Sequence, residues 1–274
     1  MNANNLGLAI INKTVVPIRK RPENESSLLD EGLFGMVVKL IKSEEKGWYL
    51  IETLYDYRGY VHENDLLIDI DRALNWEKEA NYLIVHPIVD IMKEPNYKNY
   101  KIQLVTKGAS IKITGNKKDD WIEVMLPTYE KGWLKKGYIE KKQNYDTGKD
   151  EKVLREKLVK TACEYIGTQY RWGGKSPLGI DCSGLCSITY LINGITIWRD
   201  SELRKKYMRE IKRKEMKKGD LLYYKGHVAM YIGNGKVVHS SSSRSGVSIN
   251  SLNEGDDDYV EELDREIIAI GTIF

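Results

Sequence analysis

The sequence has 274 residues, of which 41% are hydrophobic, and it carries 43 basic and 40 acidic side chains for a net charge of +3. This length suggests about two domains, or three small ones, and the hydrophobic share supports well-filled cores. The charge is almost balanced and no concentrated basic stripe is present, so nucleic acid is not an expected partner.

The start of the chain and its hydropathy bear on location. Residues 1–12 have no basic region and too short an apolar run for a secretory signal, and no stretch approaches a membrane span. As written, the sequence predicts a soluble, cytoplasmic protein without a membrane span. A chain already trimmed of its signal would look the same, so a secreted or wall-associated protein is the alternative.

The first 140 residues contain an internal repeat with a constant offset of 73. Val16-x-Ile18-x-Lys20-x-Pro22 matches Val89-x-Ile91-x-Lys93-x-Pro95, and Gly59-Tyr60-Val61 matches Gly132-Trp133-Leu134. Each copy reads as short alternating strands between turn residues, with no helix of useful length. Two small all-β barrels are therefore expected, at residues 1–70 and 81–141.

Four aromatic and imidazole side chains of these barrels need an interpretation. Trp48 and Trp121 occupy equivalent positions of the repeat, and we interpret them as core rings rather than ligand contacts. His62 and His86 lie in the predicted barrels, far in sequence from any cysteine. They are expected to be surface or hydrogen-bonded histidines.

Two segments read as connections. Asp71–Ala80 is a largely charged link with helical potential, and Lys141–Glu151 is the clearest linker. Apolar residues then recur with helical period from Val153 to Ile166, with Cys163 on the apolar side as a small core residue. A helix followed by strands predicts an α+β domain over residues 150–274.

A glycine-rich loop leads into the next predicted helix at Asp181-Cys-Ser-Gly184. Apolar residues at helical spacing follow, and Gly194 is a natural stop. Cys182 therefore falls in the first turn, where unpaired N–H groups and the positive end of the helix dipole lie. That setting favours the thiolate that a cysteine nucleophile needs.

Two histidines downstream complete a candidate site. His227 and His239 lie in two predicted strands joined by a turn at Gly233-Asn-Gly235. An antiparallel pair around that turn brings the two rings within diagonal reach. One histidine would then take the thiol proton and the other would orient it, as in papain-like sites.

Residues 151–274 resemble the NlpC family of bacterial cell-wall cysteine peptidases. The resemblance implies that Cys182 is the nucleophile, His227 the base and His239 the third member, with Tyr170 close to the nucleophile. It implies cleavage between D-γ-glutamate and a diamino acid, either meso-diaminopimelate or lysine. The motifs that carry it are Tyr170-x-Trp172-Gly-Gly, Asp181-Cys-Ser-Gly184, Gly219-Asp-Leu221, His227-Val-Ala-Met-Tyr-Ile-Gly233 and Val238-His-Ser240.

The resemblance also bears on the other cysteine chemistry. A zinc site from Cys182, Cys186, His227 and His239 is possible on ligand types, but the family match explains the same residues without a metal. A disulfide between the two cysteines is not expected, because helical neighbours at this spacing sit about 5–6 Å apart and a bridge needs Cβ atoms about 3.8 Å apart. We expect no cofactor and no metal, and Cys186 as a residue packed beneath the helix.

The repeated barrels resemble a pair of bacterial SH3-like domains. In SH3-bearing family members that trim free peptides, an acid and a tyrosine of the first domain meet the free amine of an N-terminal L-alanine. The tyrosine matches Tyr57, whereas the closest register places Leu29 at the acid, with Asp30 beside it. We expect Asp30 to serve, assisted by Asp200, with Trp172 as an apolar wall. A one-residue shift within a strand would turn Asp30 to the other face.

Further residues are candidates for substrate binding. Asp181 and Ser183 flank the predicted nucleophile, where they are expected to cap the helix. A second role in binding substrate is the open alternative. Asp200 and Ser201 belong to an Arg-Asp-Ser pattern that family members carry near the substrate. Many members have proline just before it, where this chain has Trp198.

These observations predict a multidomain chain of two small all-β SH3-like barrels followed by an α+β papain-like catalytic domain. The expected function is a monomeric cysteine endopeptidase acting on peptidoglycan-derived peptides with a free N-terminal L-alanine. One alternative is a hydrolase of intact cell wall, or an amidase, on the same scaffold. Another is a non-catalytic wall-binding protein, against which the intact Cys182, His227 and His239 argue.

Overall fold

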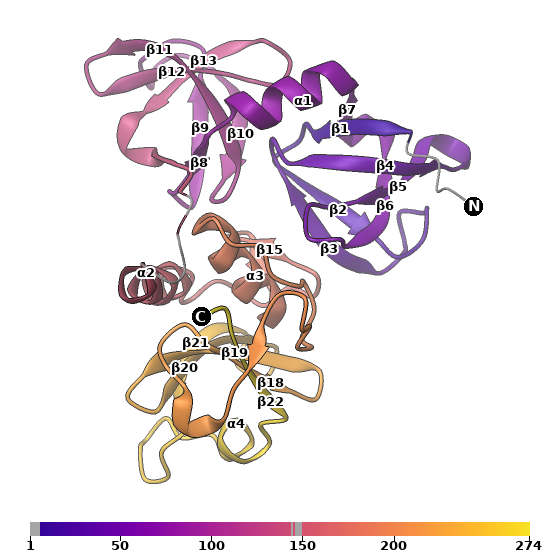
Figure 1. Cartoon of the computed structure of the whole chain (residues 1–274). Helices are drawn as coiled ribbons and strands as arrows, with labels where there is room; N and C mark the ends of the chain where they lie inside the picture. The colour runs from indigo at the N-terminus through magenta and orange to yellow at the C-terminus, as the bar shows by residue number, and fades with distance from the viewer. Residues whose placement is uncertain (1–5, 144, 146–149) are drawn as a thin grey trace. The chain divides into compact units, whose positions relative to one another are not determined.

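The computed structural model describes residues 6–143, 145 and 150–274. Its chain divides into two compact units, residues 1–142 and 143–274, and Figure 1 shows the ribbon of both. The predicted linker at Lys141–Glu151 falls partly on residues 144 and 146–149, which lie outside the described residues.

The first sheet of the amino-terminal unit is formed by residues 7–68 and runs in the order β3-β2-β6-β5-β4-β1-β7. Neighbouring strands are antiparallel, as short connections between alternating segments require. The strands are β1 (Gly7–Ile11), β2 (Val15–Arg19), β3 (Leu28–Leu33), β4 (Val37–Ser43), β5 (Trp48–Glu52), β6 (Arg58–His62) and β7 (Leu66–Ile68).

The second sheet has the same strand order, β10-β9-β13-β12-β11-β8-β14, each strand standing for its counterpart in the first. The repeat in the sequence is therefore a repeat in topology, and the two all-β barrels are confirmed. The strands are β8 (Tyr82–Ile84), β9 (Ile88–Met92), β10 (Lys101–Thr106), β11 (Ser110–Lys118), β12 (Trp121–Met125), β13 (Lys131–Lys135) and β14 (Ile139–Lys141). Short 3-10 turns lie at Glu45–Gly47, Glu63–Asp65 and Lys136–Tyr138.

The charged link between the barrels forms helix α1 (Ile70–Glu79), as predicted. Its N-cap is Asp69, whose carboxylate accepts the N–H of Arg72 at 3.0 Å and so satisfies one of the open donors of the first turn. Trp76 faces inward, and its indole N–H donates to the carbonyl oxygen of Gly35 at 2.9 Å. The helix thus packs on the first barrel along its buried side.

The two barrels share core residues. Phe34, from the first barrel, is 1% exposed and packs among the apolar side chains of the second barrel. Backbone bonds continue the contact, since Ser110 N donates to Phe34 O at 3.0 Å. Trp48 and Trp121 are each 6% exposed, which confirms them as core rings. Because both barrels belong to one compact unit, the limits at residues 70, 81, 141 and 150 stay a proposal.

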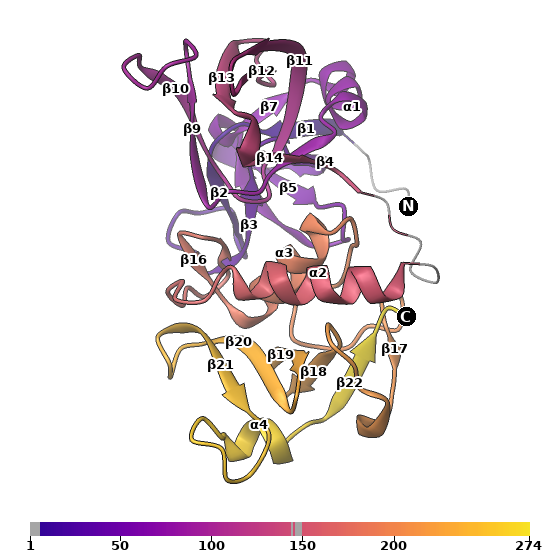
Figure 2. The ribbon, with the colours of Figure 1, turned by 90° about the vertical axis from the view of Figure 1, so that its left-hand side faces the viewer.

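The carboxyl-terminal unit is an antiparallel sheet in the order β17-β22-β18-β19-β20-β21. Helices α2 and α3 pack against β19, while α4 lies on the opposite face (Figure 2). This is the predicted α+β arrangement. The strands are β15 (Lys175–Ser176), β16 (Gly179–Ile180), β17 (Arg209–Glu210), β18 (Leu221–Tyr224), β19 (His227–Gly233), β20 (Lys236–Ser241), β21 (Gly246–Ser251) and β22 (Ala269–Thr272). The helices are α2 (Glu151–Cys163), α3 (Cys182–Ile192) and α4 (Glu261–Arg265), with a 3-10 turn at Arg213–Glu215.

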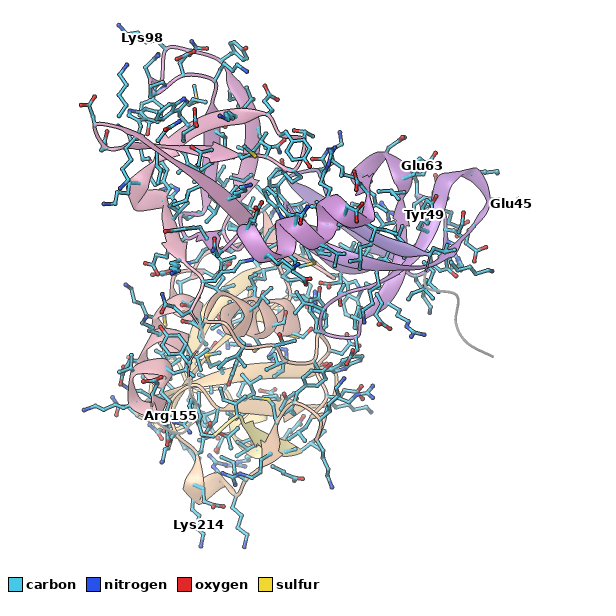
Figure 3. All side chains as sticks on the ribbon, turned by 45° about the horizontal axis from the view of Figure 1, so that its top comes forward. Glu45, Tyr49, Glu63, Lys98, Arg155 and Lys214 are labelled. Atoms are coloured by element: carbon cyan, nitrogen blue, oxygen red, sulfur yellow. The ribbon has the colours of Figure 1, made fainter. Side chains whose placement is uncertain are left out.

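Helix α2 buries only part of the predicted apolar stripe. The members of the stripe that are fully buried are Leu154, Leu158 and Ala162. Val153 and Ile166 are 54% and 50% exposed, and Cys163 is only half-buried at the last residue of the helix. The buried face also includes Arg155 (labelled in Figure 3), which pairs with Asp220 at 2.8 Å. A buried ion pair of this kind is invisible to a count of apolar residues.

Candidate active site

The nucleophile predicted from the sequence is the first residue of α3. Its helix begins where the Asp181 carboxylate accepts two backbone donors, Gly184 N at 2.6 Å and Gly173 N at 2.7 Å. Close backbone packing also explains the glycine of this motif, since a Cβ on Gly184 would lie 2.0 Å from the carbonyl oxygen of Gly174. Cys182 is therefore held at a helix start that is tied directly to the preceding loop.

An arginine that we did not predict as functional fixes this helix start. Arg199 is 1% exposed, and its guanidinium donates to both carboxylate oxygens of Asp181 at 3.0 and 3.2 Å. It also donates to Ser183 Oγ at 2.7 Å. Asp181 and Ser183 thus cap and brace the helix, and their predicted role in substrate binding stays a proposal.

The thiol of Cys182 is almost covered, at 7% exposure. The backbone N–H groups of Val228 and Ser183 act to lower the pKa of this thiol, so the sulfur lies near the peptide unit that joins His227 to Val228. Tyr170 lies close enough that the charges of Cys182 and Asp181 help burial to raise the pKa of its phenol. Cys182, His227 and Tyr170 therefore lie close together, and their catalytic roles stay a proposal.

The resting state of the thiol differs from the expected thiolate. Burial, aided by the Asp181 carboxylate, raises the pKa of Cys182 to about 11. The two N–H groups and Arg199 act in the opposite direction but do not outweigh them. The positive end of the helix is already bonded to the Asp181 carboxylate, so it does little to stabilise a thiolate. Cys182 therefore rests as a thiol and needs a base at the moment of attack.

The predicted base, His227, belongs to a hydrogen-bonded line of side chains. His227 Nε2 lies 2.9 Å from His239 Nδ1, and His239 Nε2 lies 3.0 Å from Asn250 Oδ1. The diagonal reach across the β19–β20 hairpin is thus confirmed, and Nδ1 of His227 is the ring nitrogen left for the thiol. Burial, together with His239, lowers the pKa of His227 to about 4, so the ring is a neutral proton acceptor at neutral pH.

With His227 as the predicted base, its lowered pKa predicts the acid limit of the reaction. Because the neutral imidazole persists below the ordinary histidine value, kcat/KM should fall only as the pH drops through about 4. The acid limb of kcat/KM reports the free enzyme, so a pH profile on an uncharged reporter amide measures it. A limb near 6.5 would show that His227 titrates like an exposed histidine. His86→Gln, at an exposed histidine of the second barrel, is the control and should leave the limb in place.

The remaining predicted binding residues lie in both units. In the carboxyl-terminal unit, Trp172 is 68% exposed, Asp200 is exposed and Ser201 is partly buried. Trp198 stacks on Tyr207 with ring centroids 6.3 Å apart, so the tryptophan that replaces proline has a packing role here. The predicted roles of Trp172, Asp200 and Ser201 in substrate binding stay proposals.

In the first barrel, Asp30 lies on β3 and is fully buried. The hydroxyl of Tyr55 donates to its carboxylate, and the rings of Tyr55 and Tyr57 lie 6.5 Å apart. Ile18 pairs with Asp30 but Arg19 pairs with Leu28, so Leu29 is the extra residue of a β-bulge. Because a bulge adds one residue to a strand, it can compensate for the one-residue shift between Leu29, the position expected for the acid, and Asp30.

The alternatives that involve metal or disulfide chemistry have no counterpart in the described ranges. All three cysteines are free thiols, and Cys186 is buried at 1% exposure, beneath α3. Among residues 6–143, 145 and 150–274, no cluster of three or more histidine, cysteine or acidic residues could hold a metal ion.

Comparison with known proteins agrees with this geometry. The NlpC/P60 family model matches residues 167–260, and the model of the bacterial dipeptidyl-peptidase SH3 domain matches residues 18–66. Dipeptidyl-peptidase 6 of Lysinibacillus sphaericus is 38% identical over 270 residues, covering 97% of this chain and 99% of the relative. The chain belongs to the NlpC/P60 family. It is a cysteine peptidase, and the non-catalytic alternative is set aside.

Other known proteins are similar over different shares of the chain. A γ-D-glutamyl-L-lysine dipeptidyl-peptidase of Bacillus cereus is 30% identical over 218 residues, covering 75% of this chain and 62% of that protein. A crystal structure of an NlpC/P60 family protein from Bacillus cereus matches with a TM-score of 0.77 at 21% identity, over 97% of this chain and 99% of that one. The fold of SH3-like barrels followed by a catalytic domain is thereby confirmed.

Within the part of the chain that the structure describes, none of the helices of this NlpC/P60 peptidase combines the length and hydrophobicity needed to cross a membrane.

Proposed function

We propose that this peptidase hydrolyses the γ-D-glutamyl–L-diamino acid bond of peptidoglycan peptides that carry a free N-terminal L-alanine. The observation that carries the proposal is similarity over nearly the full length of a dipeptidyl-peptidase, barrels included. Removal of two residues from a free amino end is the reaction such a name describes. A shorter match to a γ-D-glutamyl-L-lysine dipeptidyl-peptidase supports the choice of bond.

The proposed chemistry uses the three side chains of the site. As the Cys182 sulfur attacks the γ-carbonyl carbon of D-glutamate, its proton passes to His227 Nδ1. The backbone N–H of Cys182, at the open start of α3, is a donor for the oxyanion that forms. His227 then gives the proton to the departing amine of the diamino acid. A thioester remains, and water, deprotonated by the same ring, hydrolyses it to release L-Ala-D-Glu and the thiol.

The free amine is the finer part of the proposal. We assign it to Asp30 and Tyr57 of the first barrel, with Asp200 assisting and Trp172 as an apolar wall. The bulge at Leu29 supports Asp30, because it takes up the one-residue shift that separated Asp30 from the expected position. The oxygens of the Asp30 side chain, one of them bonded to the Tyr55 hydroxyl, are acceptors of the kind that an ammonium group needs.

Acetylation of the substrate amine tests this assignment. With L-Ala-γ-D-Glu-L-Lys, and with its meso-diaminopimelate counterpart, wild type should show a much higher kcat/KM for the free than for the N-acetylated peptide. Acetylation removes the positive charge and adds bulk at the same place. Asp30→Asn should lower kcat/KM for the free peptide and narrow the difference, while mass analysis of the products identifies the bond.

Glu52→Gln is the matched control, since this carboxylate of the same barrel pairs with Lys39 and Arg58 at the surface. It should keep the preference for the free amine. If wild type cleaves the acetylated peptide as well as the free one, the amine assignment is wrong, and hydrolysis of intact cell wall becomes the better function. Product masses that place the cut elsewhere would refute the bond itself.

A further inference from the structure

A buried asparagine extends the hydrogen-bonded pair formed by His227 and His239. Asn250 lies on β21 and is 2% exposed. In the β20–β21 ladder, His239 stands directly opposite Ser248, so Asn250 is its diagonal neighbour on the same face. Its Oδ1 lies 3.0 Å from His239 Nε2.

The orientation of the Asn250 amide is determined by its other end. Asn250 Nδ2 donates to the backbone carbonyl of Asp258 at 3.0 Å. A carbonyl oxygen can only accept, so the NH2 group must face Asp258 and the Oδ1 atom must face His239. Flipping the amide would set two oxygens against each other at one end. The bond to the backbone carbonyl of Asp258 therefore ensures that the atom facing His239 is an oxygen, which can only accept a hydrogen bond.

This fixed acceptor determines where the ring protons are. Asn250 Oδ1 can only accept, so His239 must carry its proton on Nε2 and present a lone pair at Nδ1. That lone pair lies 2.9 Å from His227 Nε2, which must then donate. His227 is left with a bare Nδ1, the nitrogen that receives the thiol proton.

We propose that Asn250 is a positioning residue that sets the tautomers of both His239 and His227 and so keeps the base of the site able to accept a proton. The proposal rests on the proposed catalytic roles of Cys182 and His227. Without Asn250, the opposite pair of tautomers becomes accessible. In it His239 Nδ1 donates to His227 Nε2, and a proton sits on the His227 nitrogen that should receive one.

A neutral amide suits this position. Burial lowers the pKa of His239, although the bond from Asn250 acts to raise it, so the ring stays neutral and keeps its Nδ1 lone pair. When His227 takes the thiol proton, the resulting imidazolium donates through Nε2 to that same lone pair. The line of three side chains thus stabilises the cation through hydrogen bonds, and the charge of the nearby Asp181 carboxylate acts in the same direction by raising the pKa of His227.

Two variants separate this role from a structural one. Asn250→Leu removes both bonds at similar volume. Asn250→Asp keeps an acceptor for His239 but cannot donate to the Asp258 carbonyl, so it loses the anchor of the following turn. If Asn250 sets the tautomers, kcat should fall about 10²-fold or more in Asn250→Leu with little change in KM, and Asn250→Asp should recover much of it. If Asn250 is only an anchor, Asp should be no better than Leu.

Asn193→Leu is the matched control. Asn193 is also buried, at 6% exposure, but its side chain bonds to Thr161 Oγ1 at 3.0 Å and to Thr189 O at 2.9 Å, and to no histidine. The same substitution should lower the melting temperature and leave kcat close to wild type. Loss of activity in both asparagine variants alike would assign the effect to stability and overturn the proposal.

The tautomers themselves are a readout that needs no substrate. The chain has four histidines, so long-range ¹H–¹⁵N spectra of the full chain with His62→Gln and His86→Gln leave only the two site rings. Both should be protonated at Nε2, and Asn250→Leu should change at least one. An Nδ1-protonated ring in the otherwise wild-type site would refute the proposal. If wild type cleaves no muropeptide but shows these tautomers, the proposed function fails and this inference stands.

Discussion

Replacing Cys182 by alanine is expected to abolish peptide cleavage while the protein stays folded. No other sulfur can replace it, since Cys186 is buried at 1% exposure and Cys163 lies at the far end of α2. The helix start should survive, because the Asp181 cap and its bonds to Arg199 do not involve the thiol. Turnover of the tripeptide by mass detection, with a melting curve beside it, measures both parts.

The other two cysteines are the controls. Cys186→Ser places a hydroxyl where the thiol is fully buried, and a buried hydroxyl without a partner costs about 1–3 kcal/mol of stability. Cys163→Ser should cost less, because this residue is half-buried. Both variants should still cleave. Cleavage retained by Cys182→Ala would remove Cys182 from the role of nucleophile.

Replacing His227 by glutamine is expected to lower kcat by about 10²–10⁴-fold, the usual worth of a general base. The effect should be this large because Cys182 rests as a thiol: a pKa raised to about 11 leaves almost no thiolate to react unaided. Glutamine can bond to His239 but takes up no proton at neutral pH. Single-turnover rates of thioester formation isolate the affected step.

Substitution of His239 separates orientation from proton transfer. His239→Asn and His239→Gln offer an amide oxygen to His227 Nε2, so part of the activity should survive at this position. Losses of equal size at His227 and His239 would contradict the division of roles between them. Cys182→Ala supplies the background rate for both series.

The catalytic hairpin was predictable because its geometry is local. A turn at Gly233-Asn-Gly235 sets the register between β19 and β20, and a 12-residue separation of His227 and His239 then fixes their diagonal contact. The constant sequence offset likewise implied that the two barrels share one topology, although it did not give the order of the strands.

Contacts across longer connections were not predictable. Asn250 meets His239 only through the β20–β21 register, which is set by a serine-rich turn with no single preferred pairing. Arg199 reaches Asp181 from a loop beyond α3. Arg155 is buried by Asp220, 65 residues away. Each is a polar residue whose burial depends on a distant partner, so periodicity alone places it at the surface.

Phe34 gives the tandem barrels a property that their repeated sequence conceals. Two copies of a motif suggest modules that can be cut apart and recombined, yet this ring belongs by chain to one copy and by packing to the other. Excising the first barrel would leave an unfilled hole in the second, and excising the second would expose a phenylalanine to water. The packing of this one side chain ties the two barrels together, so we expect the pair to fold, and to tolerate engineering, only as one piece.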